Sequence, residues 1–192
     1  MLRRLYDRTI ALASSPHAIW ALALVAFVES SVLPIPPDVL IIPMIIARPR
    51  RAFRIAAVAT AASIAGGLAG YWIGWGLFES VGRPVLAFYG KDVFFDDFAA
   101  TYYAWGAWAV LIAGVTPFPY KVITILSGAT GLNIWVFLAA SLVARGLRFF
   151  VVAALLWKFG PLVRDFIERR LGLMFTLFLA ILIGGFTLVR FL

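Results

Sequence analysis

Five ionisable residues lie within otherwise uncharged, apolar stretches of the sequence: Glu29, Asp38, Lys121, Arg145 and Arg148. Arg145 and Arg148 are spaced i and i+3, so they share one face of a helix. Guanidinium groups offer paired donors that match the oxygens of a phosphate. Because three cations face two carboxylates, one positive charge is left over, and we predict that Arg145, Arg148 and Lys121 bind an anionic headgroup. The alternative is that the five charges only neutralise one another and hold the fold together.

The two carboxylates are candidates for proton coupling. Glu29 follows an apolar run and precedes two serines, and burial in such surroundings favours the protonated form of a carboxyl. Asp38 follows a cluster of prolines and is a second candidate, or else a partner of Arg145 or Arg148. Whether these charges form a substrate site or an ion-pair lock stays open from the sequence.

Several other kinds of chemistry lack the residues that they need. The chain has no cysteine and a single histidine, His17. Disulfides, thiol nucleophiles and iron–sulfur clusters are therefore excluded, and a histidine metal cage is disfavoured. We predict no catalytic residue, no cofactor and no metal site, which disfavours a lipid-phosphate hydrolase.

The overall composition indicates whether water or lipid surrounds the protein that holds these charges. Of 192 residues, 64% are hydrophobic and 14% charged, and the mean hydropathy is +0.99. A chain of this size has too little interior to hide so much apolar surface from water, so it requires lipid. The predicted fold class is an all-α integral membrane protein. We interpret the net charge of +8 as arginine anchors for anionic lipid rather than as a nucleic-acid interface.

Hydropathy and proline positions divide the chain into one membrane domain, 1–192. The stretch 18–47 is too long for one span and too short for two, and Pro34, Pro36 and Pro37 should make Leu33 to Asp38 non-helical. Non-helical backbone survives at membrane depth only inside protein or a wet cavity, which favours a re-entrant hairpin. The predicted elements are an interfacial helix (1–15), re-entrant hairpin 1 (18–47), a transmembrane helix (52–78), an external loop with an interfacial helix (79–103), re-entrant hairpin 2 (104–132), and transmembrane helices at 133–157 and 172–192.

An internal repeat supports this division. Residues 33–40 match residues 116–123, including the Pro-x-Pro that places Pro117 and Pro119 at the second tip. Residues 61–64 likewise match residues 139–142, so each hairpin is followed by a similar helix. With one crossing between them, the hairpins would enter from opposite faces, as in transporters built from inverted repeats.

The charge pattern predicts the orientation of the chain in the membrane, and the glycine pattern predicts close helix packing. The arginine-rich segments at 3–8, 48–54 and 158–170 all fall on one face in this topology, so the positive-inside rule predicts a cytoplasmic N-terminus and a multi-pass protein. A small-residue face for close helix packing is formed by Gly66, Gly67, Gly70 and Gly74. A homodimer through this face or through the 172–192 helix is left open.

Taken in order, these motifs resemble the DedA family, also called the SNARE-associated or VTT domain, and within it the short YqaA-like branch. The resemblance covers about residues 15–160. It depends on four motifs: Phe27-Val-Glu29-Ser-Ser with the proline tip up to Asp38, Gly66-Gly67-x-x-Gly70-Tyr71-x-x-Gly74, Gly114-Val-Thr-Pro117-Phe-Pro119-Tyr120-Lys121, and Arg145-x-x-Arg148-Phe149-Phe150.

The resemblance implies a bacterial inner-membrane protein with two opposed re-entrant hairpins. It also implies a proton-dependent role in recycling polyprenyl-phosphate carriers or phospholipids across the bilayer. The family's acidic pair and basic residues would carry over to Glu29, Asp38, Arg145 and Arg148. The chain departs from many members in its second tip, where Gly114 and Tyr120 replace flanking arginines and Lys121 is the one cation.

The expected function is therefore a flippase-like transporter that moves a phosphate-bearing lipid, coupled to protons. Its partners would be membrane lipids with anionic headgroups. The alternative from another class is a scaffold that affects membrane homeostasis through partner proteins and transports nothing. A transporter would need the buried charges for activity, whereas a scaffold would tolerate their loss.

Overall fold

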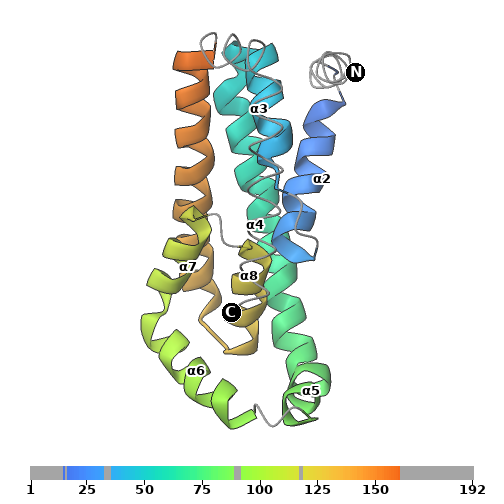
Figure 1. Cartoon of the computed structure of the whole chain (residues 1–192), viewed down its shortest axis with the longest axis vertical. Coiled ribbons are helices and arrows are strands. Elements are labelled where there is room, and N and C mark those ends of the chain that lie inside the picture. The colour runs from blue at the N-terminus through green and yellow to red at the C-terminus, as the bar shows by residue number, and fades with distance from the viewer. Residues whose placement is uncertain (1–14, 16, 33–35, 89–91, 117–118, 161–192) are drawn as a thin grey trace, which may run out of the picture.

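The computed structural model describes residue 15 and residues 17–32, 36–88, 92–116 and 119–160 (Figure 1). Every regular element among these residues is helical, which confirms the all-α prediction for the described chain. Apart from Ser15, the predicted helices at 1–15 and 172–192 lie outside the described residues, as do Pro34 and Pro117. The helices are α2 (Ala18–Ser31), α3 (Asp38–Ala47), η1 (Pro49–Arg51), α4 (Ala52–Leu77), η2 (Phe78–Gly82), α5 (Arg83–Phe88), α6 (Asp92–Trp105), α7 (Ala107–Val115), α8 (Tyr120–Ala129) and a last helix, Ile134–Gly160.

Two continuous helices are long and apolar enough to cross a membrane. They are Pro49–Gly82, with 34 residues, and Ile134–Gly160, with 27. At about 1.5 Å per residue, even the shorter one exceeds a hydrocarbon core of about 30 Å. Their outward faces carry exposed large apolar side chains, as contact with lipid requires: Trp72, Trp75, Trp135, Leu142, Leu147, Val151 and Leu155. These helices identify the chain as a membrane protein.

Four of the shorter helices form two antiparallel pairs, α2 with α3 and α7 with α8 (Figure 1). In Figure 1, α2 descends and α3 ascends along the upper half of α4, while α7 ascends and α8 descends in the lower half. With 14 and 10 residues, α2 and α3 reach only about 21 and 15 Å, too short to cross a bilayer alone. Between α6 and α7 the chain bends by 83° at Gly106, whose φ of +48° is a left-handed conformation that favours glycine.

The first tip differs from the sequence prediction at one residue. Asp38 was expected to be non-helical, but it is the first residue of α3. Pro37 precedes it with φ −66° and ψ −17°, so the proline already has helical dihedral angles. A proline is tolerated at a helix start because the first backbone N–H groups have no intrahelical acceptor. As a result, the Asp38 carboxylate lies in the first turn, where a helix favours negative charge.

The glycine face of α4 is covered by helices of the same chain. A Cβ on Gly66 would collide with the backbone of Phe27 in α2, and a Cβ on Gly74 would collide with the backbone of Ile125 in α8. Gly70 lies against Thr124, while Gly67 faces side chains of α8 and of the last helix. These glycines therefore serve packing within the chain, and the face is not available for a homodimer.

The apolar interior is divided into two clusters. The first joins α2, α3, the start of α4 and the end of the last helix: Leu22, Ile41, Met44, Ile45, Ala52, Ile55, Ala56, Ala59, Phe149, Ala153 and Leu156. The second joins the end of α4, α6, α7, α8 and the start of the last helix: Tyr71, Tyr102, Val110, Tyr120, Ile123, Leu132, Phe137 and Ala140. Buried polar residues lie between the two clusters on α4 and on the last helix.

Candidate functional site

A layer of buried polar side chains separates the two apolar clusters. It draws on α2, α4, α8 and the last helix, and its members are Glu29, Ser30, Ser31, Thr60, Ser63, Thr124, Ser141 and Arg145. Another buried hydroxyl, that of Ser127, lies within the second cluster against Tyr102. Burial of polar groups costs free energy unless they are hydrogen-bonded. The partners of these side chains therefore decide what the layer can do.

Arg145 is the best-buried charge of the layer, with 1% of its side chain exposed. Its Nη2 donates to Glu29 Oε2 at 2.6 Å, and its Nε donates to Ser63 Oγ at 2.7 Å. The hydroxyls of Ser30 and Ser63 are 2.7 Å apart, and Ser30 also donates to Glu29. Arg145 thus connects α2, α4 and the last helix through a network in which both charges are paired.

Two aromatic rings enclose the Arg145 guanidinium. Its Cζ lies 4.7 Å from the ring centroid of Tyr120 and 4.7 Å from that of Phe149. Cation–π contacts of this kind are strongest where water is excluded. The Tyr120 hydroxyl donates to Ser141 Oγ, which fixes the ring. The Glu29–Arg145 pair therefore has the features of a structural lock.

Arg148 forms a second ion pair that is more accessible. Its Nη2 donates to Asp38 Oδ2 at 2.7 Å, and its Nη1 donates to the Thr116 carbonyl at 2.9 Å. The side chains of Arg148 and Asp38 are 20% and 23% exposed. Asp38 begins α3 and Thr116 ends α7, so one guanidinium joins both hairpin tips. Of the two partners that the sequence left open for Asp38, the structure shows Arg148.

Lys121 also connects the two hairpin tips, from the second hairpin to the first. It lies in the first turn of α8, and its Nζ donates to the Val32 carbonyl of α2 at 2.9 Å. Val32 and Thr116 are the C-terminal caps of α2 and α7. Cations at helix C-termini are favourable because the terminal carbonyls lack intrahelical donors. We call Asp38, Lys121 and Arg148, with the two carbonyls, the tip cluster.

The structure thus brings all five predicted ionisable residues together, but it divides them into two groups. Glu29 and Arg145 are enclosed, whereas the tip cluster is partly exposed. Of the tip prolines, Pro37 is buried, and Pro36 and Pro119 are exposed. Glu29 was expected among apolar neighbours and two serines, and it is bound by one of these serines, Ser30, and by Arg145.

Sequence reasoning gave no role in the Glu29–Arg145 network to Ser30, Ser63, Tyr120 or Phe149, although Ser30, Tyr120 and Phe149 stand within the motifs of the family resemblance. A signal for Ser63 was present, since the repeat match pairs it with Ser141, and both accept buried hydrogen bonds. The contact of the Tyr120 and Phe149 rings with Arg145 could not be predicted, because aromatic residues are frequent throughout this apolar sequence.

Within the described ranges, no three His, Cys, Asp or Glu side chains gather as a metal site would need. His17 is exposed and precedes the first residue of α2.

Comparison with known proteins gives two relatives of similar length. The chain is 33% identical over 168 residues to an uncharacterized protein of Haemophilus influenzae, covering 85% of this chain and 87% of that protein. It is 35% identical over 168 residues to the "Uncharacterized protein HI0703 homolog" of Histophilus somni, with the same coverage. No protein-family model and no solved structure matches the chain. At this identity and coverage, the chain belongs to the same family as these proteins of Haemophilus influenzae and Histophilus somni.

Proposed function

We propose that this protein is a transporter that moves a phosphate-bearing lipid across the membrane. The observation that carries the proposal is the tip cluster, in which Arg148 and Lys121 hold the two hairpin tips together through partly exposed contacts. Two cations against one carboxylate leave a net positive charge in this cluster. Phosphate is an anion that both guanidinium and ammonium donors bind well.

The topology in this proposal is an inverted repeat of re-entrant hairpins. α2 with α3 enters from one side and α7 with α8 from the other, and their tips meet at the tip cluster. The short lengths of these helices and the direct contacts between Lys121 and Val32, and between Arg148 and Thr116, support this topology. Opposed hairpins meeting at the midplane form the usual substrate site of such transporters.

The tip contacts suggest how transport would proceed. A phosphate headgroup competes with Asp38 for Arg148, and with the Val32 carbonyl for Lys121. Protonation of Asp38 removes its charge, weakens its bond to Arg148 and frees the guanidinium for the headgroup. The tips are then no longer joined, and the site opens toward one side. Glu29 and Arg145 keep their buried pair throughout, so Asp38 rather than Glu29 is the proton-coupling residue in this mechanism.

The resemblance to the DedA family supports the choice of substrate. It implies a bacterial inner-membrane protein acting on polyprenyl phosphate or phospholipid, and the positive-inside rule gives a cytoplasmic N-terminus. We do not propose a lipid-phosphate hydrolase, because His17 stands about 18 Å along α2 from Glu29, away from the charged centre. The competing proposal is a scaffold that uses the same ion pairs only for folding.

The experiment is headgroup-dependent lipid translocation in proteoliposomes. Wild type is compared with Arg148→Gln and Asp38→Asn at pH 6 and pH 8, with and without an imposed pH gradient. Phosphatidylglycerol, phosphatidylcholine and a polyprenyl phosphate are the labelled lipids. The matched control is Arg83→Gln, because Arg83 pairs with Glu79 at the surface, with side chains 44% and 72% exposed.

The expected result is translocation of a phosphate-bearing lipid by wild type and by Arg83→Gln. Arg148→Gln should lower the rate by at least about tenfold, the equivalent of one charge-assisted hydrogen bond. Asp38→Asn, which mimics the protonated state, should reduce the dependence on the pH gradient. If well-folded wild type moves none of these lipids at either pH, the transporter proposal is refuted and the scaffold is favoured.

A further inference from the structure

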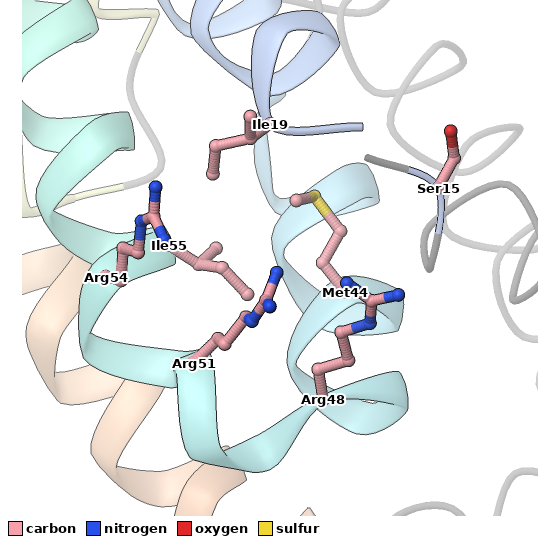
Figure 2. A pocket seen from close by; sticks show the side chains of 7 residues that line it. All are labelled: Ser15, Ile19, Met44, Arg48, Arg51, Arg54 and Ile55. Carbon is pink, nitrogen blue, oxygen red and sulfur yellow. The ribbon is translucent and has the colours of Figure 1, made fainter. Parts of the chain in front are cut away.

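Three arginines line a cavity at the end of the molecule where α3 leads into α4 (Figure 2). The cavity has a volume of about 140 Å³, and its lining is Ser15, Ile19, Met44, Arg48, Arg51, Arg54 and Ile55. On the continuous helix, Arg51 precedes Ser63 of the Arg145 network by about 18 Å. The cavity is therefore separate from the buried charges and the tip cluster.

The charged residues in the described lining of this cavity are of one sign. None of the described lining residues is acidic. Arg51 and Arg54 are exposed, and neither forms an ion pair with any residue that the structure describes. Like charges at close range repel one another, so an anion between these guanidinium groups would lower the electrostatic energy of the folded protein.

The wall beneath the guanidinium groups is apolar. Met44 and Ile55 are 5% and 4% exposed, and Ile19 of α2 is half-buried. Figure 2 shows the Arg51 guanidinium reaching toward the space between Met44 and Ile55. A cationic rim above an apolar wall suits a ligand with an anionic head and an apolar body. A free phosphate would use only the rim.

The size of the cavity agrees with such a ligand. A single water needs about 10–15 Å³ of comparable space. The observed volume of about 140 Å³ therefore accommodates a group several times larger, such as a phosphodiester. Basic pockets between helices at the cytoplasmic surface are a known form of headgroup recognition. The predicted orientation places this end of the protein at that surface.

We propose that this cavity binds the phosphodiester of an anionic phospholipid, with Arg51 and Arg54 as the main phosphate donors. The acyl chains would leave along the apolar side formed by Ile19, Met44 and Ile55. This site is distinct from the tip cluster and does not depend on the transport proposal. Its function is to hold a resident lipid beside the start of α4.

The experiment is native mass spectrometry of the purified full-length chain, titrated with phosphatidylglycerol, phosphatidylcholine or inorganic phosphate. The variants are Arg51→Gln, Arg54→Gln and the control Arg50→Gln. Arg50 is exposed and lies in η1 beside Arg51, but it does not line the cavity. All three variants lose one positive charge, so they differ only in the position of that charge. A tryptophan-fluorescence melt checks that each variant is folded.

We expect the Kd of the tightest-bound phosphatidylglycerol to rise about fivefold in Arg51→Gln and in Arg54→Gln. In Arg50→Gln it should stay within about twofold, and phosphatidylcholine should bind more weakly throughout. Equal losses in all three variants would show general attraction by the basic surface and overturn the proposal. Phosphatidylcholine binding as tightly as phosphatidylglycerol would also overturn it. Inorganic phosphate that binds with the same variant pattern, and displaces no lipid, would refute the lipid assignment.

Discussion

Replacing Arg145 with glutamine is expected to destabilise the protein far more than the same replacement at Arg148. Arg145 is 1% exposed and makes two charge-assisted hydrogen bonds and two cation–π contacts. Its loss leaves the Glu29 carboxylate buried without its counter-charge. Breaking a buried ion pair by removing one partner costs about 3–5 kcal/mol. Arg148 and Asp38 are only about one fifth exposed, so their pair should contribute about 1 kcal/mol, the upper end of the range for exposed pairs.

The assay is equilibrium unfolding in detergent micelles, followed by fluorescence of the seven tryptophans. The expected difference in the free energy of unfolding between the two variants is about 2–4 kcal/mol. A second variant makes the cause explicit. Adding Glu29→Gln to Arg145→Gln removes the stranded carboxylate, so the double variant should be more stable than Arg145→Gln alone.

Two results would refute the reasoning. Equal destabilisation by Arg145→Gln and Arg148→Gln would mean that burial does not distinguish the two pairs. Additive losses in the Glu29→Gln and Arg145→Gln combination would mean that the 2.6 Å contact between these side chains contributes no coupling energy.

Three further predictions concern packing, charge and backbone. Gly66→Ala should lower the free energy of unfolding by about 1–3 kcal/mol, because the new methyl group overlaps the Phe27 backbone. Gly76→Ala is the control: its methyl group would meet no atom within 4 Å, so the free energy of unfolding should rise by up to about 1 kcal/mol. Lys121→Met should lower lipid translocation about tenfold while changing stability by less than about 1 kcal/mol, so a loss of folding would count against its role in binding. Gly106→Ala should lower the free energy of unfolding by about 1–2 kcal/mol, because a φ of +48° is unfavourable for alanine. An effect equal to that of Gly76→Ala would contradict this interpretation of the bend.

Much of the fold follows from the sequence. The two long helices were predictable because lipid selects apolar runs of sufficient length, and the prolines at 34–37 indicated where the chain must turn. The spacing of Arg145 and Arg148 placed both on one helix face, and both do reach carboxylates of α2 and α3. The error at Asp38 arose because proline disrupts helix interiors but is compatible with a helix start.

The pairing of these charges could not be predicted from the sequence. Which carboxylate reaches which arginine depends on how far α2 and α3 extend along α4, and this depth is set by close contacts such as Gly66 against Phe27. The burial of Glu29 with Arg145, and the exposure of Asp38 with Arg148, likewise depend on how the helices lie relative to one another. Sequence periodicity describes one helix at a time, so it does not show how far one helix extends along its neighbour.

The position of Lys121 bears on the proposal that the tip cluster is a binding site rather than a lock. The repeat pairs Asp38 with Lys121, and both lie in the first turn of a helix, α3 and α8 respectively. A carboxylate is stabilised there, whereas a cation is disfavoured by the same partial positive charge. Lys121 is offset by the Val32 carbonyl, which carries part of the negative charge of the α2 C-terminus, and no described carboxylate pairs with it. An uncharged donor could make the same contact with Val32, so the net positive charge of the tip cluster is the feature on which the proposed anion site depends.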